Sequence, residues 1–305
     1  MTILYPVPNN DFGRLIERVF NEVRMPLRSS KYSNHIYSNF VHVYCLIYKE
    51  RLNVSYRRFK QIAEDMQLNR LLGLKKMPHF TTIQKFLQRV DKQLFRRMVR
   101  ACHKLMHLVK LECSIDATGL SLTNPSHYYR KRIDGICVKN YVKTSLNVEN
   151  RHKLVLDIET HCTNSHDTND FIPLLEQLEH VTLVLADKAY DSAKNIKYVT
   201  QQLKADCHIP VREWKQGRLG YGHKPHIHGK HRLRMLKHFN KQKYGMRSIV
   251  ESINSALKRT MGSYVCSHRP DNQQKQVVLK ALAYNIEIMA ARSLVKFKAL
   301  ILWFA

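Results

Sequence analysis

The sequence has few features of a secreted or membrane-spanning protein. Its seven cysteines stand singly, and an odd number without paired spacing argues against a disulfide framework and against a zinc ribbon. No apolar run reaches the roughly 18 residues that a membrane-spanning helix needs. The N-terminal MTILYPVPNN lacks the basic head and apolar stretch of a secretion signal. We therefore expect a cytoplasmic protein in a reducing compartment.

Acidic residues are also scarce, at 24 against 51 lysines and arginines, which gives a formal net charge of +27. Such an excess repels itself unless a polyanion is present. Nucleic acid is the leading candidate for that polyanion, and an acidic membrane surface is the second. The 305 residues are enough for one large domain or for two modest ones.

Residues 1–108 read as a helical N-terminal domain. Apolar residues recur at helical spacing in four segments, which are residues 12–24, 35–51, 56–68 and 80–107. Thr81 and Gln84 have the spacing of a capping box at the start of the fourth segment. Two short helices joined through LGLKKMPHF would resemble a helix-turn-helix DNA reader. An ordinary bundle with a basic solvated face explains the same pattern equally well.

Residues 109–305 change to an α/β pattern. The segment CSIDATGLSL alternates as a strand does, and VTLVLA is a continuous apolar run typical of a strand buried on both faces. The expected strands are 113–122, 142–150, 153–161, 181–186 and 207–211, and the expected helices are 171–178, 190–203 and 244 to the end, with a break around 261–271. This order predicts a ribonuclease-H-like core, a mixed five-stranded sheet flanked by helices.

A basic segment at 212–243 is expected to be a loop between the last strand and the final helices. It holds ten lysines or arginines against one acid, Glu213. Basic groups neutralise phosphates, and its aromatic residues Trp214, Tyr221 and Phe239 are suited to stack on unpaired bases. The segment also contains His223, His226, His228 and His231. A zinc site there is not favoured, because no cysteine accompanies these histidines and their spacing is poor.

Three carboxylates are the candidate catalytic residues. Asp116 lies in the middle of the first expected strand, Asp187 follows the VTLVLA strand, and Glu251 lies on the later helix. The end of a strand in an α/β sheet opens a crevice. Hard cations such as Mg²⁺ take oxygen ligands, and two ions about 4 Å apart can hold a scissile phosphate. We therefore expect two Mg²⁺ ions, with Mn²⁺ as a substitute, at Asp116, Asp187 and Glu251.

The helix that carries Glu251 has one polar face. At about 100° per residue, the side chains on this face fall within an arc of about 80°, and they are Tyr244, Arg247, Glu251, Ser255 and Lys258. Arg247 and Lys258 would meet DNA phosphates on either side of the cut. A plain surface helix would also place polar residues opposite its core stripe, so spacing alone leaves both interpretations open.

The residues Tyr244, Arg247, Glu251 and Lys258 match all four positions of the Y-(2)-R-(3)-E-(6)-K signature. The chain thereby resembles the DDE transposases of prokaryotic insertion sequences. SIDATGL around Asp116 is similar to the first-aspartate segment of that family, and LADKAYDS around Asp187 is similar to the second.

The resemblance implies Asp116, Asp187 and Glu251 as metal ligands, and Tyr244, Arg247 and Lys258 as contacts to transposon-end DNA. It also implies terminal inverted repeats and target DNA as double-stranded substrates, cleavage and strand transfer as the chemistry, and a dimer or larger synaptic assembly. A nucleoid-associated location in a prokaryote, with no membrane partner, would follow. The pair His166–Asp167 is a further candidate for the same site, although a turn explains it better.

Two other functions are compatible with the same residues. A ribonuclease-H-like nuclease without strand transfer would use the same triad and metals. A catalytically inactive DNA-binding relative would keep the basic surface, although such a protein usually loses a triad member or a domain, and neither loss is seen here.

Overall fold

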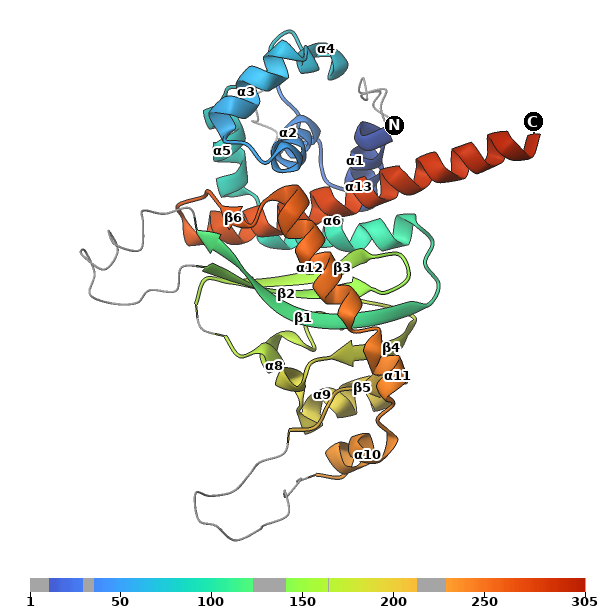
Figure 1. Ribbon diagram of the computed structural model, residues 1–305. Coiled ribbons are helices and arrows are strands. Elements are labelled where there is room, and N and C mark those ends of the chain that lie inside the picture. The colour runs from blue at the N-terminus through green and yellow to red at the C-terminus, as the bar shows by residue number, and fades with distance from the viewer. Residues whose placement is uncertain (1–10, 30–35, 123–140, 164, 213–228, 305) are drawn as a thin grey trace, which may run out of the picture.

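The computed structural model describes residues 11–29, 36–122, 141–163, 165–212 and 229–304, with side chains as far as residue 292. The elements form layers (Figure 1): the N-terminal helices lie on one side of a central sheet, and a group of short helices lies beyond the sheet on the other side. The long C-terminal helix runs between the N-terminal helices and the sheet. Among these described residues, no helix is both long enough and apolar enough to cross a membrane.

The sheet has the strand order β3-β2-β1-β4-β5. Strands β1, β2 and β3 form an antiparallel meander, and β4 and β5 continue the sheet parallel to β1. The bounds are β1 Leu111–Leu122, β2 Tyr141–Glu149, β3 Leu154–His161, β4 Val181–Ala186 and β5 Asp206–His208. This topology confirms the ribonuclease-H-like prediction. A sixth strand, β6 (Tyr264–Val265), pairs with the end of β1; with two residues it is too short to leave a periodic signal in the sequence.

Both faces of the sheet are buried, which is why β4 is apolar except for the exposed Thr182. On one face, Leu120 and Leu146 belong to a core shared with the N-terminal and C-terminal helices. On the other face, Cys113 and Ile115 pack with Phe171 and Tyr190 in a second core. Alternate residues of β1 therefore point to different cores, as the two-residue period of a strand requires.

The N-terminal helices are α1 Asp11–Glu22, α2 Asn39–Leu52, α3 Tyr56–Asp65, α4 Leu68–Leu71, α5 Phe80–Arg89 and α6 Lys92–Leu105. The expectation of one helix over 80–107 was wrong. Val90 has extended backbone, and Asp91 caps α6 by accepting a hydrogen bond from Gln93 N at 3.1 Å. The expected cap at Thr81 was also wrong, because the N-cap is His79, whose side chain accepts from the Thr81 backbone.

The C-terminal helix α13 (Pro270–Phe304) joins the two parts of the chain. It contacts α1, α2 and α6 as well as β3, so one apolar core runs from the N-terminal helices to the sheet. The change from helix to strand falls where the sequence placed it, since α6 ends at Leu105 and β1 begins at Leu111.

Beyond the second core, the chain is less helical than predicted. The segment expected as a helix over 171–178 forms successive turns, because Pro173 has no N–H to donate to a helix. The helix expected over 190–203 is divided into two short pieces, α9 (Ala193–Lys197) and the π turn η2 (Tyr198–Gln202). The 3₁₀ turn η1 (Lys188–Tyr190) precedes them. The preceding short helix is α8 Asp167–Asp170.

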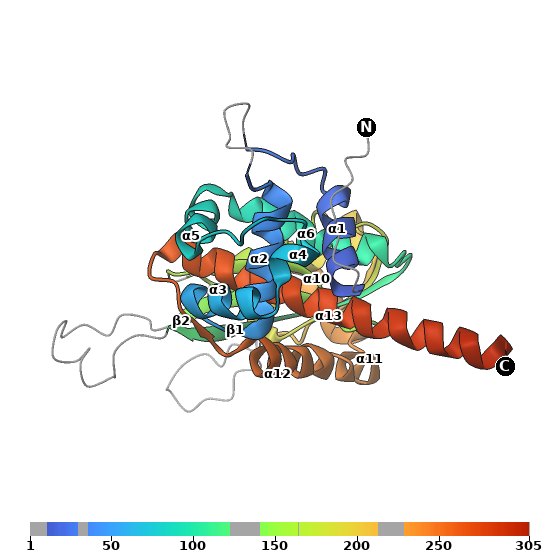
Figure 2. The same cartoon turned by 90° about the horizontal axis from the view of Figure 1, so that it is seen from above.

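The basic segment expected as a loop contains two helices, α10 Lys230–His238 and α11 Lys241–Gly245. Helix α12 (Ser248–Met261) follows, and α11 and α12 run one after the other along one side of the molecule (Figure 2). The break that the sequence predicts near residue 261 is confirmed, because α12 ends at Met261. Gly262 follows with φ of +84°, and a Cβ there would lie 2.4 Å from the Asn53 side chain.

Candidate active site

Two of the predicted carboxylates are neighbours across the sheet. The parallel pairing of β1 with β4 ends at Ile115 and Ala186. Asp116 is the next residue of β1, and Asp187 is the residue that follows β4. Adjacent strands are about 4.8 Å apart. Asp187 leaves the strand as the N-cap of η1, where its Oδ1 accepts a hydrogen bond from Lys188 N at 2.6 Å. The sheet itself therefore brings the first two members of the expected triad together.

Helix α12 brings the third carboxylate to them. The helix packs on β1, and Arg247 at its N-terminus forms an ion pair with Glu251 one turn later. Arg247 Nη1 also lies 3.7 Å from Asp116 Oδ1. One guanidinium thus lies between a carboxylate of the sheet and a carboxylate of the helix.

The electrostatics show that the three carboxylates influence one another. Burial raises the pKa of Asp116; the Ala117 backbone N–H and Arg247 oppose this, and the charges of Asp187 and Glu251 raise the pKa further. The net direction is upward. Nearby like charges disfavour the ionised form of a carboxylate, so Asp187 and Glu251 both act on Asp116.

Tyr244 and Lys258 extend the site at its two ends. The Arg247 guanidinium lies 5.9 Å from the centroid of the Tyr244 ring. The Phe239 ring also packs against Tyr244, with ring centroids 5.2 Å apart. Lys258 Nζ donates to Thr118 Oγ1 at 2.6 Å, two residues along β1 from Asp116. The expectation of one continuous helix through Tyr244 was wrong, because three-residue turns at Met246 and Arg247 separate α11 from α12.

Asn254 is a site residue that the sequence reading missed. It is buried on α12, and its Nδ2 lies 3.4 Å from Asp116 Oδ2. Its Oδ1 is buried and has no hydrogen-bond partner among the described residues. The available signal was its position three residues after Glu251, which places both on neighbouring parts of one helix surface. A polar residue beside an apolar core stripe at that spacing was the clue.

The carboxylate oxygens suit a divalent metal ion, but Asp116, Asp187 and Glu251 do not meet at one point in this structure. Among the described residues, no three His, Cys, Asp or Glu side chains are close enough together to hold a metal ion. Arg247 supplies positive charge between Asp116 and Glu251 instead. Carboxylate oxygens are the ligands that Mg²⁺ prefers, and the unpartnered Oδ1 of Asn254 is a further oxygen nearby. The oxygen ligands available are therefore of the type that a hard cation takes.

The remaining predicted residues lie elsewhere or outside the description. Trp214, Tyr221, His223, His226 and His228 fall outside the described residues, and His231 lies in the first turn of α10.

The base of α10 is fixed to the segment after Asp187. Arg232 forms an ion pair at 2.6 Å with Asp191, whose side chain is fully buried. Asp167, for which the sequence favoured a turn over a place in the site, pairs with Lys143 at 2.7 Å. This pair lines a cavity of about 540 Å³ beside Thr118 of β1.

The fold and the paired aspartates define a ribonuclease-H-like protein with a carboxylate site. Residues 108–286, more than half of the chain, match the family described as the transposase DDE domain, and the chain belongs to that family. It is also similar to a cryo-EM structure of a piggyBac transposase synaptic complex with hairpin DNA, at 11% identity and a TM-score of 0.43. That match covers 94% of this chain and 74% of that chain. No curated protein matches the chain.

Proposed function

We propose that this protein is a transposase that binds the terminal inverted repeats of an insertion sequence and catalyses metal-dependent DNA cleavage and strand transfer. The observation that carries the proposal is the side-by-side placement of Asp116 and Asp187, with Glu251 linked to Asp116 through Arg247. Acidic side chains brought into one region in this way suit phosphodiester chemistry better than structural ion pairing, because the charges of Asp187 and Glu251 disfavour ionisation of Asp116 unless a cation is present.

Asp116, Asp187 and Glu251 would hold two Mg²⁺ ions, or Mn²⁺ in their place. Bound ions would supply activation of the attacking oxygen and charge stabilisation at the leaving oxygen. Asn254 positions the Asp116 carboxylate through its amide. With such ions bound, the Arg247 guanidinium would be available to bind a DNA phosphate.

Tyr244, Arg247 and Lys258 are proposed to contact the transposon end. The two cations lie at opposite ends of the carboxylate site, and Lys258 is held toward β1 by Thr118. Phosphate contacts of this kind fix the register of the DNA without reading its sequence. The formal net charge of +27 supports a large polyanionic substrate. Because two ends must be joined to one target, a dimer or larger synaptic assembly is proposed, acting on DNA in a prokaryotic nucleoid.

A strand-transfer assay tests this function against simple hydrolysis. Labelled duplex with pre-cut element ends is incubated with the full chain, a circular target plasmid and Mg²⁺. The proposal predicts labelled plasmid products that require the terminal sequence and disappear in the Asp187→Asn variant. Hydrolysis of both DNAs without joined product would identify a nuclease instead, and binding without either reaction would identify an inactive relative.

A further inference from the structure

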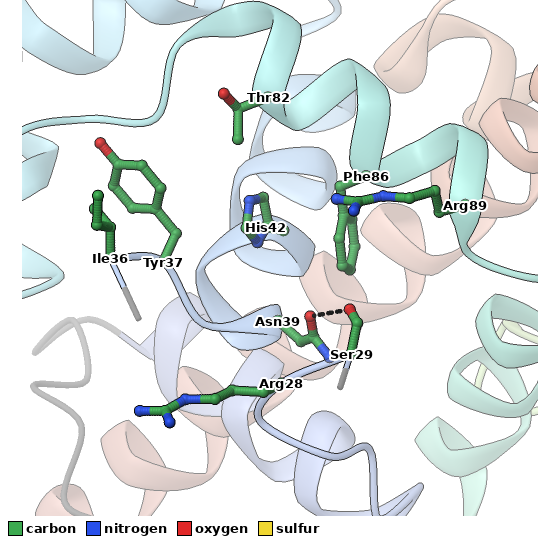
Figure 3. Close-up of a pocket in the computed structure, with 9 residues that line it drawn as sticks. All are labelled: Arg28, Ser29, Ile36, Tyr37, Asn39, His42, Thr82, Phe86 and Arg89. Atoms are coloured by element: carbon green, nitrogen blue, oxygen red, sulfur yellow. Dashed lines mark hydrogen bonds between the residues drawn. The ribbon is translucent and has the colours of Figure 1, made fainter. Parts of the chain in front are cut away.

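A second candidate ligand site lies in the N-terminal helices, away from the carboxylates. A cavity of about 370 Å³ opens between the start of α2 and one face of α5, and Figure 3 shows the side chains that line it. Its lining residues are Arg28, Ser29, Ile36, Tyr37, Asn39, His42, Thr82, Phe86 and Arg89. The volume is at the small end of the range for pockets that hold small molecules.

His42 presents an unused hydrogen-bond acceptor in this cavity. The residue is only 7% exposed, and its Nδ1 lies 2.8 Å from the Ser38 carbonyl oxygen. A carbonyl only accepts, so Nδ1 carries the hydrogen and Nε2 carries a lone pair. Nε2 is buried and has no partner within the described part of the chain. Burial lowers the pKa of His42, and nearby Arg89 lowers it too, so the ring stays neutral and ready to accept.

The cavity walls are flat and aromatic. The His42 ring stacks on Phe86 with centroids 4.6 Å apart and an interplanar angle of 13°, and Tyr37 meets His42 edge-on at 6.1 Å. Asn39 already has partners, since Ser29 donates to its Oδ1 and its Nδ2 donates to the Pro26 carbonyl. The fixed polar groups are thus satisfied, and the open requirement is a donor for His42.

The rim of the cavity is cationic. Arg89 is exposed, and no ion pair to it is found among the described residues. In Figure 3 its guanidinium extends toward Phe86 and His42, whereas that of Arg28 points away from it. Among the described residues, no Asp or Glu lines the cavity. An anionic group beside Arg89 would therefore meet an uncompensated positive charge.

We propose that this cavity binds a nucleoside phosphate, with a planar base donating an N–H to His42 Nε2 and a phosphate held by Arg89. Because Phe86 is only 1% exposed and is stacked on His42, the half-buried Tyr37 ring corresponds to the base face, His42 Nε2 to the base edge and the Arg89 guanidinium to the phosphate. The choice of a nucleotide among planar anions rests on the proposed function. The nucleotide has two possible sources, an unpaired residue of a DNA strand or a free nucleotide, and the recognition chemistry is the same for both.

Calorimetric titration of the full chain tests the proposal. The probes are the four deoxynucleoside 5′-monophosphates and inorganic phosphate. We expect at least one nucleotide to bind about tenfold or more tightly than phosphate, because a base adds stacking and a hydrogen bond. Arg89→Gln should weaken nucleotide binding about tenfold. Lys85→Gln is the matched control, because Lys85 is an exposed cation on α5 outside the cavity.

A second variant tests the acceptor. His42→Phe keeps an aromatic ring against Phe86 but removes Nε2, and it should reduce the preference for nucleotide over phosphate while phosphate binding persists. The source is decided by competition with a duplex that ends in unpaired bases and with the same duplex made blunt. The proposal is overturned if every nucleotide binds no better than phosphate, or if Arg89→Gln behaves like Lys85→Gln. Glu251→Ala should bind nucleotide normally whatever its cleavage activity, so failure here is distinct from failure of the transposase assignment.

Discussion

Arg247 lies between two carboxylates of the candidate active site, 3.7 Å from Asp116 and in an ion pair with Glu251. The pairing joins the sheet to α12, although the two acids are far apart in the sequence. A single positive charge cannot neutralise three carboxylates, so Asp187 adds net negative charge to a partly buried site. Under the proposed function, bound cations would balance this remaining charge.

The contact between Lys258 and Thr118 predicts a measurable salt effect. Lys258→Ala should weaken binding to element-end duplex and reduce the slope of log affinity against log salt concentration by about one unit. Arg259→Ala is the control, because Arg259 is the exposed neighbour on α12. Fluorescence anisotropy at several salt concentrations measures both slopes. Identical slopes for the two variants would remove Lys258 from the DNA interface.

Asn254 should affect catalysis more than stability. Asn254→Ala removes the amide beside Asp116, and loss of such a positioning contact typically lowers metal affinity or activity about tenfold or more. The free energy of unfolding should fall by only about 1 kcal/mol, the usual contribution of one hydrogen bond. Metal-titrated cleavage and chemical unfolding measure the two effects, with Ser255→Ala as the exposed control. A large loss of stability with unchanged metal dependence would make Asn254 purely structural.

Buried His103 predicts how stability depends on pH. Burial, with Lys104 and Arg100 nearby, lowers the pKa of His103 from 6.5 to about 4. The unfolded chain therefore binds the proton first as pH falls, so the folded state is favoured above about pH 6.5 and loses stability down to about pH 4. The full loss is on the order of 3 kcal/mol.

Urea unfolding at pH 7, 6 and 5 measures this loss. His103→Gln should flatten the dependence on pH, whereas His107→Gln should leave it unchanged, because His107 is exposed on the turn after α6. Equal slopes in all three proteins would show that His103 does not control acid stability.

The strands and the basic character were predictable because each leaves a local pattern, and so were the positions of Asp116 on β1 and of Asp187 after β4. The catalytic role of the three carboxylates stays a prediction. Asp116 takes a polar position in an alternating strand, and Asp187 directly follows a run of mostly apolar residues. What escaped prediction depends on contacts between distant segments. Asn254 gains its position only when α12 packs on β1, and β6 forms only because β1 offers a free edge. The cavity around His42 likewise requires α2 and α5 to meet, which no spacing within either helix encodes.

Local competition explains the misplaced helix ends. A continuous apolar stripe predicted one helix over 80–107, but Asp91 accepts from the backbone and starts a new helix. Asp is among the residues that favour helix caps over helix interiors for this reason. The break before α12 similarly follows Gly245, a residue with a high conformational entropy cost in a helix.

Cleavage of the element's own ends tests the central claim most directly. A labelled duplex spanning the element boundary is incubated with Mg²⁺, with Mn²⁺ and with EDTA, using the native chain, Glu251→Ala and the neighbouring control Ser252→Ala. The Glu251 side chain is 55% exposed, so its removal should leave the fold intact. We expect the native chain and Ser252→Ala to cut at the boundary with either metal and not to cut with EDTA. Glu251→Ala should bind the duplex without cutting it. Cutting that persists in Glu251→Ala would contradict the assignment of this active site.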